Sequence, residues 1–424
     1  MLFIRQLKDT ARWLILAIAV GILAGSASAL LIVMLNWATS TREAHPWIIA
    51  LLPIAGLVVG LMYHYFGRSV EAGNNLIVTE IHAEAREARS TVPFRMTPLI
   101  LIGTALTHLF GGSAGREGTA LQTGASLADQ IDLILSHIPH LSLSRRDRRT
   151  LLIAGISAGF GSVFGTPLAG AVFGLEVLTI GSVGYDAIFP CFLAAFAADY
   201  VTHAWRVHHT IYTVTELAPL TPINMLAAIV AGIAFGITAL LFARTTHAIS
   251  AIFKKHVTYA PLRPFIGGSL VAIAVFSIGI AHTSKYIGLG IPTIVAAFSQ
   301  HLPRYDFAAK FAFTTVTLGA GFKGGEVTPL FYIGATLGNA LSSFLPLPSS
   351  LLAAMGFVAV FAGAANTPIA SSLMALELFG PEAGAFAAIA CVTSYLFSGH
   401  KGIYHAQKLG TSKEYTDAKA TDNL

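Results

Sequence analysis

Apolar residues occur in long runs along this chain, and polar residues are confined to short stretches between them. A membrane-spanning helix needs about 20 mainly apolar residues, yet several runs are shorter and begin or end at glycine clusters. Short, interrupted helices at membrane depth are tolerated only where they line a protein cavity or a water-filled path. The pattern therefore predicts an all-α, polytopic membrane protein with tilted and broken helices. The runs fall near residues 13–37, 47–65, 97–110, 120–135, 150–180, 185–205, 223–243, 264–282, 307–320, 327–345, 351–378 and 383–398.

The composition excludes a soluble fold. Hydrophobic residues make up 54% of the 424 residues and charged residues only 11%, whereas soluble proteins carry about 25% charged residues. A chain of this length has room for roughly ten membrane passes. The first run continues beyond Ala27-Ser28-Ala29, which would mark a signal-peptide cleavage site, so we expect an uncleaved first helix.

The net charge of +5 comes from lysines and arginines gathered in short hydrophilic pieces. This is the positive-inside pattern of cytoplasmic loops and ends, so it indicates no nucleic-acid partner. We expect both the N-terminus and the tail after Gly402 in the cytoplasm. The clusters are Arg5/Lys8/Arg12, Arg145/Arg146/Arg148/Arg149, Lys254/Lys255 and Lys401/Lys408.

The chain also repeats itself. The segment from Gly155 to Glu176 matches the segment from Gly356 to Glu377 at a constant offset of 201 residues, and a second pair of matching segments begins near Gly115 and Gly325. Internal repeats with broken helices are typical of secondary transporters. We expect one transmembrane domain over 1–424, with repeat halves near 1–210 and 211–410 and a short cytoplasmic tail at 411–424. The equivalent positions of Glu176 and Glu377 predict a symmetric structural role, such as binding loop N–H groups.

Three segments place glycine and then polar residues at an expected helix start. They are Gly73-Asn74-Asn75, Gly115-Arg116-Glu117-Gly118-Thr119 and Gly324-Gly325-Glu326-Val327-Thr328-Pro329. Free backbone N–H groups at a helix N-terminus suit an anion. Ionisable residues within a membrane usually line a substrate or proton path. The three segments together predict movement of an anion across the membrane.

These segments, in this order, resemble those of the CLC family of chloride channels and anion/proton antiporters, over nearly the whole chain. The family motifs are Gly-Ser-Gly-Ile-Pro, Gly-Arg-Glu-Gly-Pro and Gly-x-Phe-x-Pro, followed by a late tyrosine; Gly115–Gly118 is a full match to the second motif. The resemblance implies a CLC-type fold of two inverted-topology halves with about 18 helices. It also implies a homodimer with one pore per subunit. The nucleotide-binding-like regulatory domains of some members are not expected.

Departures from these motifs look like the branch of the family that exports fluoride. Asn74 replaces the motif serine, Thr119 the proline and Val327 the phenylalanine, with Glu326 and Thr328 beside it. Fluoride is smaller than chloride and accepts hydrogen bonds more strongly, so amide and hydroxyl donors suit it. Chloride accepts the same donors, so a chloride channel or chloride/proton antiporter of the same family remains the alternative to a fluoride/proton antiporter.

Glu117 is the expected gating and proton-coupling group, because a carboxylate occupies an anion site when charged and leaves it when protonated. The alternative is a structural carboxylate paired with Arg116. Glu326 is expected to relay protons or repel larger anions; capping a helix or pairing with Lys323 is its alternative. Chloride/proton antiporters of the family carry a second acid where this chain has Val177, so their inner proton route is in doubt here.

The expected anion-binding set combines backbone and side-chain donors. Asn74 is either an ion-facing amide or an N-cap residue, and the resemblance favours Tyr404 over Tyr395 as the tyrosine that closes the path. The set is Asn74, Gly115, Arg116, Gly118, Thr119, Val327, Thr328 and Tyr404.

Other functional classes find little support in the sequence. His137/His140 and His208/His209 lack Cys or Asp partners at metal-ligand spacing, so no metal and no cofactor are expected. We expect neither a His-Glu-x-x-His site nor a Gly-x-Ser-x-Gly site, and therefore no membrane-embedded enzyme. The expected partners are a small anion, protons, membrane lipid and a second copy of the chain, in a prokaryotic inner membrane.

Overall fold

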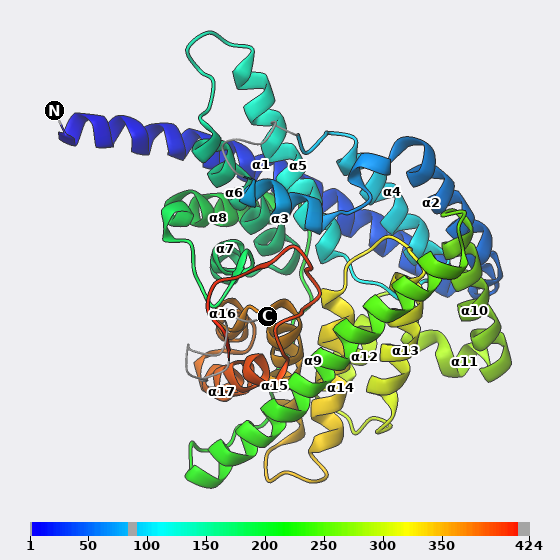
Figure 1. Cartoon of the computed structure of the whole chain (residues 1–424). Coiled ribbons are helices and arrows are strands. Elements are labelled where there is room, and N and C mark those ends of the chain that lie inside the picture. The colour runs from blue at the N-terminus through cyan, green and yellow to red at the C-terminus, as the bar shows by residue number, and fades with distance from the viewer. Residues whose placement is uncertain (1, 84–90, 414–424) are drawn as a thin grey trace, which may run out of the picture.

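The computed structural model describes residues 2–83 and 91–413, and those residues are almost entirely helical (Figure 1). The helices are α1 (Leu2–Ala44), α2 (Leu52–Phe66), α3 (Asn74–His82), α4 (Met96–Leu109), α5 (Glu117–Ser136), α6 (Arg145–Phe164), α7 (Pro167–Glu176), α8 (Ile188–Ala204), α9 (Pro222–His256), α10 (Leu262–Ile278), α11 (Ile280–Thr283), α12 (Ile291–Ala296), α13 (Asp306–Gly319), α14 (Val327–Leu341), α15 (Ser349–Ala365), α16 (Pro368–Phe379) and α17 (Pro381–Phe397). Short 3-10 turns lie at Pro46–Leu51, Arg68–Val70, Tyr185–Ala187 and Ser284–Tyr286. Two-residue strands β1 (Thr179–Ile180) and β2 (Lys408–Leu409) pair in parallel.

Helix length divides the described residues into two groups. Four helical stretches are long and apolar enough to cross a membrane, and a fifth counts if α10 is joined to Ile280–Tyr286 across a bend of 116°. Five further apolar helices have only 10–17 residues, which is short for a span of about 20 residues. The expected all-α membrane fold with tilted and broken helices is confirmed, with fewer full-length spans than the roughly ten passes for which the length has room.

Two apolar runs that the sequence presents as continuous are each broken into two helices. α6 ends at Gly165, with φ +72°, and α15 ends at Asn366, with φ +58°. A left-handed residue directly after a helix is a common terminator, and the prolines that open α7 and α16 suit the first turn of a new helix. The breaks therefore come from two local stop-and-start signals inside apolar sequence.

Close helix pairs form the centre of the molecule. A Cβ built on Gly155 would lie 2.6 Å from the Gly124 carbonyl oxygen, so α5 and α6 touch backbone to backbone. α14 and α15 approach equally closely at Gly334 and Gly356. Small residues permit such contacts between membrane helices, and α5 and α14 are thereby fixed in the interior.

Glu176 and Glu377 bind helix starts reciprocally, as the repeat predicts. The Glu377 carboxylate accepts the N–H groups of Leu168 and Ala169 at 2.8 Å each, at the start of α7. The Glu176 carboxylate accepts those of Ile369 and Ala370 at 3.0 and 2.8 Å, at the start of α16. A carboxylate at a helix N-terminus satisfies free N–H groups and opposes the positive end of the dipole. Their structural role is therefore confirmed.

After α17 the chain returns to the interior, where it carries Tyr404 between the short helices; it is the red segment in Figure 1. Ile403 donates its N–H to the Ala364 carbonyl at 2.8 Å. The Gln407 side chain donates to the carbonyls of Val177 and Ala365 at 2.8 and 2.9 Å. These bonds fix the segment that holds Tyr404. Most of the expected tail, from residue 414, lies outside the described residues.

Candidate functional site

Two glycine loops meet where α5 and α14 begin. Gly115 donates its N–H to the Gly325 carbonyl at 2.6 Å, and Gly325 donates to the Gly115 carbonyl at 2.7 Å. A Cβ on Gly115 would lie 2.6 Å from a Glu117 carboxylate oxygen, and one on Gly325 would lie 2.8 Å from the backbone nitrogens of Glu117 and Gly118. Only glycine leaves room for this approach, which points two helix N-termini at one spot.

The Glu117 carboxylate occupies that spot. It is fully buried and accepts the backbone N–H groups of Arg116 and Thr328 at 3.0 Å each. The Thr328 hydroxyl also donates to it. Thr328 lies in the first turn of α14, where backbone N–H groups have no partner within the helix. The carboxylate therefore sits where a free anion would meet the same donors.

The neighbouring positions shape this pair of helix starts. Val327 is buried, and Pro329 has no N–H, so it adds no unpaired donor to the first turn of α14. Thr119 shares its hydroxyl hydrogen bond with Thr104 of α4 at 2.6 Å. The Thr119 side chain is thus engaged with α4, and any part it takes in anion binding remains a prediction for its backbone N–H.

Arg116 and Glu326 precede the two helices at equivalent places. No ion pair within the described residues joins the Arg116 guanidinium to Glu117, which removes the alternative of a structural carboxylate paired with Arg116; the Arg116 Nε is buried without a hydrogen-bond partner. The Glu326 side chain forms no cap bond on α14. Among the described residues it also forms no ion pair with Lys323, which instead lies over the Tyr63 ring, with Nζ 4.0 Å from the centroid. Both of the structural alternatives considered for Glu326 are thereby removed.

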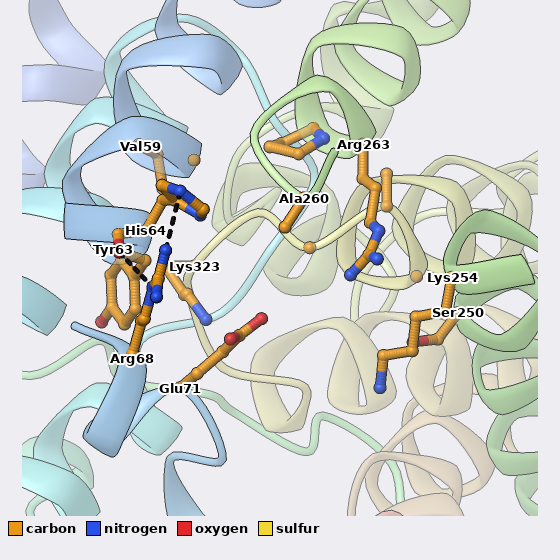
Figure 2. Close-up of a pocket in the computed structure, with 15 residues that line it drawn as sticks. Val59, Tyr63, His64, Arg68, Glu71, Ser250, Lys254, Ala260, Arg263 and Lys323 are labelled. Atoms are coloured by element: carbon orange, nitrogen blue, oxygen red, sulfur yellow. Dashed lines mark hydrogen bonds between the residues drawn. The ribbon is translucent and has the colours of Figure 1, made fainter. Parts of the chain in front are cut away.

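Lys323 belongs to a cationic cavity of about 290 Å³ that the sequence did not reveal. Figure 2 shows its side chain entering the same space as those of Arg263, Lys254 and Glu71. These residues come from α9, α10 and the loops after α2 and α13, so no local motif announces the cavity. The cavity adjoins the loop that leads to Glu326.

A second, much smaller cavity lies beside the first turn of α5 and is lined by Asn74, Leu121, Val177 and Tyr404, among others. The Asn74 Oδ1 is buried without a hydrogen-bond partner. A Cβ on Gly118 would lie 3.1 Å from the Asn74 Nδ2. We call the cavity that Asn74 and Tyr404 line the Tyr404 cavity. It brings together a polar amide and a phenol that lie 330 residues apart in sequence.

Of the two rival tyrosines, Tyr404 lies at this centre. It is buried and within electrostatic range of both Glu326 and Glu117. Tyr395 is instead covered by Lys413, whose Nζ lies 4.0 Å from the Tyr395 ring centroid. The placement agrees with the preference for Tyr404, while its contact with an anion remains a prediction.

Beside Thr328, which donates to the Glu117 carboxylate, lies a small cavity, which we call the Arg116 cavity. Arg116 and Thr328 line it together with His209 and Tyr212 from the loop before α9. Burial lowers the pKa of His209 to about 4, with nearby Arg116 and His203 adding to the effect, so its ring is neutral at pH 7. Arg116 and Thr328, which donate to Glu117, thus line the Arg116 cavity, whereas Asn74 and Leu121 line the Tyr404 cavity.

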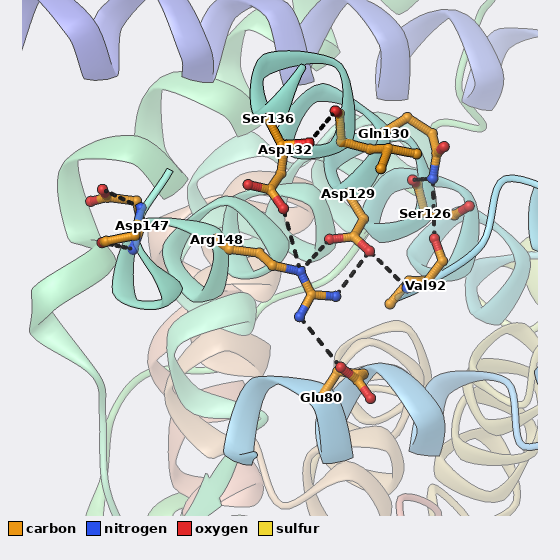
Figure 3. Close-up of polar contacts among 11 residues, drawn as sticks. Glu80, Val92, Ser126, Asp129, Gln130, Asp132, Ser136, Asp147 and Arg148 are labelled. Atoms are coloured by element: carbon orange, nitrogen blue, oxygen red, sulfur yellow. Dashed lines mark hydrogen bonds and ion pairs between the residues drawn. The ribbon is translucent and has the colours of Figure 1, made fainter. Parts of the chain in front are cut away.

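A buried ion cluster holds α3, and with it Asn74, against α5 and α6 (Figure 3). Arg148 donates to the Asp129 carboxylate at 2.6 and 2.9 Å. Arg148 also lies 3.4 Å from Glu80 of α3 and 3.7 Å from Asp132. Sequence analysis grouped Arg148 with loop charges; the structure corrects this, because its guanidinium is buried and paired with these carboxylates. Spacing along the chain gives no sign of those partners.

Contrary to expectation, the sequence contains one pattern that is typical of hydrolases. Gly155-Ile156-Ser157-Ala158-Gly159 fits the Gly-x-Ser-x-Gly pattern of hydrolases. It lies inside α6 rather than on a strand-to-helix turn, and Ser157 donates to the Ala171 carbonyl at 3.3 Å. It therefore gives no nucleophile.

The expectation of no metal-ligating set overlooked Asp199 and His203. Their ligand atoms and one of His209 lie within 4.8 Å of one another. The reason given for expecting no metal site, the lack of an Asp partner, is therefore wrong for His209.

Comparison with known proteins agrees with this geometry. Residues 55–399 match the family model described as "Voltage gated chloride channel". A Pseudomonas syringae pv. tomato protein named "Chloride/fluoride channel protein" is 58% identical over 408 residues, covering 96% of this chain and 88% of the relative. The "H(+)/Cl(-) exchange transporter ClcA" of Cronobacter sakazakii is 27% identical over 404 residues, covering 88% of this chain and 84% of the relative.

Solved structures give the same result. The crystal structure of a CLC-type fluoride/proton antiporter superimposes with a TM-score of 0.88 at 32% identity, covering 94% of this chain and 98% of the other. A slow cyanobacterial chloride/proton antiporter gives 0.78 at 20% identity, covering 93% and 96%, which supports the fold alone. This chain is therefore a multi-pass membrane protein of anion transport and not an enzyme: it belongs to the CLC family of chloride channels and anion/proton antiporters, on its fluoride branch.

Proposed function

We propose that this protein is a fluoride/proton antiporter that exports fluoride from the cell, with Glu117 as the gating and proton-coupling carboxylate. One observation carries the proposal: the Glu117 carboxylate holds the donors that an anion needs, namely two backbone N–H groups and the Thr328 hydroxyl. A helix N-terminus favours negative charge whether a side chain or a free ion supplies it. Carboxylate and anion therefore compete for one place.

Competition of this kind couples a proton to an anion. Protonation removes the charge from Glu117, so its attraction to the two helix N-termini falls. A fluoride ion then takes the vacated donors, and the neutral side chain moves aside with its proton. When the ion leaves and the proton is released, the carboxylate returns. An inward proton gradient would thereby drive fluoride out.

Selectivity for fluoride rests on the donors around this place. The Thr328 hydroxyl already donates to a carboxylate oxygen, and Asn74 brings an amide to the Tyr404 cavity. A small, strongly accepting ion gains most from short hydrogen bonds. The relative named a chloride/fluoride channel protein and the solved fluoride/proton antiporter support the same assignment.

For the proton route we propose Glu326. Its side chain makes no hydrogen bond or ion pair within the described residues, and it lies in electrostatic range of Tyr404. Val177, which lines the Tyr404 cavity, has no group that carries protons. The inner route must therefore differ from one that uses an acid at that position.

The test is efflux from proteoliposomes loaded with fluoride or with chloride, with external pH recorded in parallel. Fluoride efflux with matched proton uptake, lost or uncoupled in Glu117→Gln, supports the proposal. Chloride efflux at an equal or greater rate would replace it with a chloride channel or chloride/proton antiporter. Efflux without proton movement in the wild type would indicate a channel, as the relative's name has it.

We also propose that the protein works as a homodimer in a prokaryotic inner membrane, as the family resemblance implies. Large exposed apolar side chains on α8, such as Phe189 and Phe196, and on α17, such as Val392 and Phe397, provide faces for lipid or for a second copy. Cross-linking in native membranes tests this: a band at twice the monomer mass is expected, and a monomer alone would contradict it.

A further inference from the structure

Three potential metal ligands meet where α8 ends. Asp199 and His203 lie four residues apart on one face of the helix, and His209 comes back to them from the loop before α9. One ligand atom from each lies within 4.8 Å of the other two. The rings of His203 and His209 are edge to face, with centroids 5.5 Å apart.

Several of these ligand atoms lack hydrogen-bond partners. Both ring nitrogens of His209 are buried with no hydrogen bond in the structure, and the Asp199 Oδ1, also buried without a hydrogen bond, lies 3.5 Å from the His203 Nδ1. Buried polar atoms nearly always have a partner, and exceptions indicate an ion or another group at the site. His209 cannot turn away easily, because its ring packs on Gly165, where a Cβ would lie 2.6 Å from the His209 Cδ2. The His209 ring is thus held toward Asp199 and His203.

A hydrogen bond within α8 decides which ring nitrogen of His203 carries the proton. The His203 Nδ1 lies 2.9 Å from the Asp199 carbonyl oxygen, and a carbonyl only accepts, so Nδ1 carries the proton. The Nε2 then carries the free lone pair, and because Nδ1 is the ring nitrogen that lies 3.5 Å from the Asp199 Oδ1, the exposed ring has to rotate to bring Nε2 to the other two ligands. A histidine that donates its other ring N–H to a backbone carbonyl is the usual arrangement of a metal ligand. The His203 side chain is 55% exposed, so an ion can reach it.

We propose that Asp199, His203 and His209 bind one divalent transition-metal ion of the Zn²⁺ class. Two imidazoles and one carboxylate suit zinc, whereas Mg²⁺ and Ca²⁺ prefer all-oxygen sets. Zinc bonds of about 2.0–2.2 Å place tetrahedral ligand atoms roughly 3.3 Å apart, which the exposed His203 reaches by a small rotation. Three protein ligands leave a coordination position open. Because His209 also lines the Arg116 cavity, the ion would lie at its edge.

The test is calorimetric titration of ZnCl₂ into purified, metal-stripped protein without a polyhistidine tag. We expect one equivalent per chain with micromolar affinity. His203→Gln and Asp199→Asn should each weaken binding by about tenfold or more. The matched control is His208→Gln, because His208 is exposed, adjacent in sequence and outside the cluster; it should bind zinc as the wild type does. MgCl₂ in excess should not compete.

Two results would overturn the proposal: wild-type protein without micromolar zinc binding, or His203→Gln binding as tightly as His208→Gln. Melting curves of each variant without metal separate lost ligands from lost fold. If Asp199→Asn does not fold, His203→Gln decides the question, since its side chain is mostly exposed. The outcome is independent of fluoride transport, because the titration measures no flux.

Discussion

The starts of α5 and α14 share a backbone arrangement but differ in the residue that opens each helix. α5 opens with Glu117 and α14 with Val327, and the loops before them exchange two hydrogen bonds between Gly115 and Gly325. Only the first helix therefore supplies a carboxylate, and the second supplies its receptor, the N–H and hydroxyl of Thr328. The difference makes a pair of similar helix ends into a site with one carboxylate, the group for which we propose the gating role.

Glu176 and Glu377 show the opposite behaviour. Each binds two N–H groups of the other half's helix start, so neither can leave without exposing donors that nothing else satisfies. Glu176 and Glu377, which occur at equivalent positions of both halves, therefore have a structural role. The functional role that we propose belongs to Glu117, whose equivalent position in the other half has no carboxylate.

Removing the charge of Glu117 should have the largest effect on function. In Glu117→Gln the side chain keeps its size but no longer titrates, so fluoride-driven proton uptake should fall to background. The measurement is external pH in fluoride-loaded proteoliposomes. Glu377→Gln is the matched control and should keep coupled transport in whatever fraction folds; coupling retained in Glu117→Gln would contradict the account.

Gly325→Ala should nearly abolish transport while the fold survives. Its Cβ would lie 2.8 Å from the backbone nitrogens of Glu117 and Gly118 and 2.9 Å from the Glu117 carboxylate, so it would push the first turn of α5 and that carboxylate away from Thr328. We expect a fluoride efflux rate roughly a hundredfold lower. Gly184→Ala is the control, because its nearest neighbour, an Asp186 oxygen, lies 3.3 Å away. Equal rates for the two variants would contradict this role of Gly325.

Glu377→Ala should reduce stability more than it changes coupling. It leaves the N–H groups of Leu168 and Ala169 without their carboxylate, at a cost of about 3 kcal/mol for two charge-assisted bonds. Melting temperature in detergent is the measurement. Glu382→Ala, at an exposed helix start, should melt as the wild type does. A normal melting temperature for Glu377→Ala would remove the structural assignment.

Thr328→Val should have the smallest effect of the four. It removes one hydroxyl donor to a charged group and keeps the shape, which costs about 2 kcal/mol, or roughly 30-fold in KM for fluoride. Thr119→Val is its control, since the Thr119 hydroxyl bonds to Thr104, and its KM should change little. Equal KM values for both variants would show that the hydroxyl of Thr328 does not contact the ion.

The sequence was sufficient to predict features that depend on a local motif or on the internal repeat. The motif around Glu117 predicts a helix start, and the constant offset between Glu176 and Glu377 predicts their shared structural role. The glycine-rich starts also indicate which backbone groups lie unpaired, because a helix N-terminus leaves its first N–H groups free wherever it occurs.

Sequence was insufficient where a loop or a distant helix supplies the partner. Arg148 resembles a cytoplasmic loop charge, yet Asp129 and Glu80 surround it. Arg116 stands next to Glu117 in sequence, but among the described residues no ion pair joins the two side chains. His209 meets Asp199 only because the loop before α9 folds back onto Gly165. Contacts of this kind depend on packing, which spacing does not encode.

Calorimetry can test directly whether fluoride and the Glu117 carboxylate occupy the same place. Fluoride binding to purified wild type and Glu117→Ala is measured at several pH values. If the carboxylate competes with the ion, wild-type affinity should rise as pH falls, because protonation frees the donors of Thr328 and Arg116. Glu117→Ala should bind at least tenfold more tightly at neutral pH, with little dependence on pH. Weaker or unchanged binding in Glu117→Ala would contradict the claim that carboxylate and fluoride share one site.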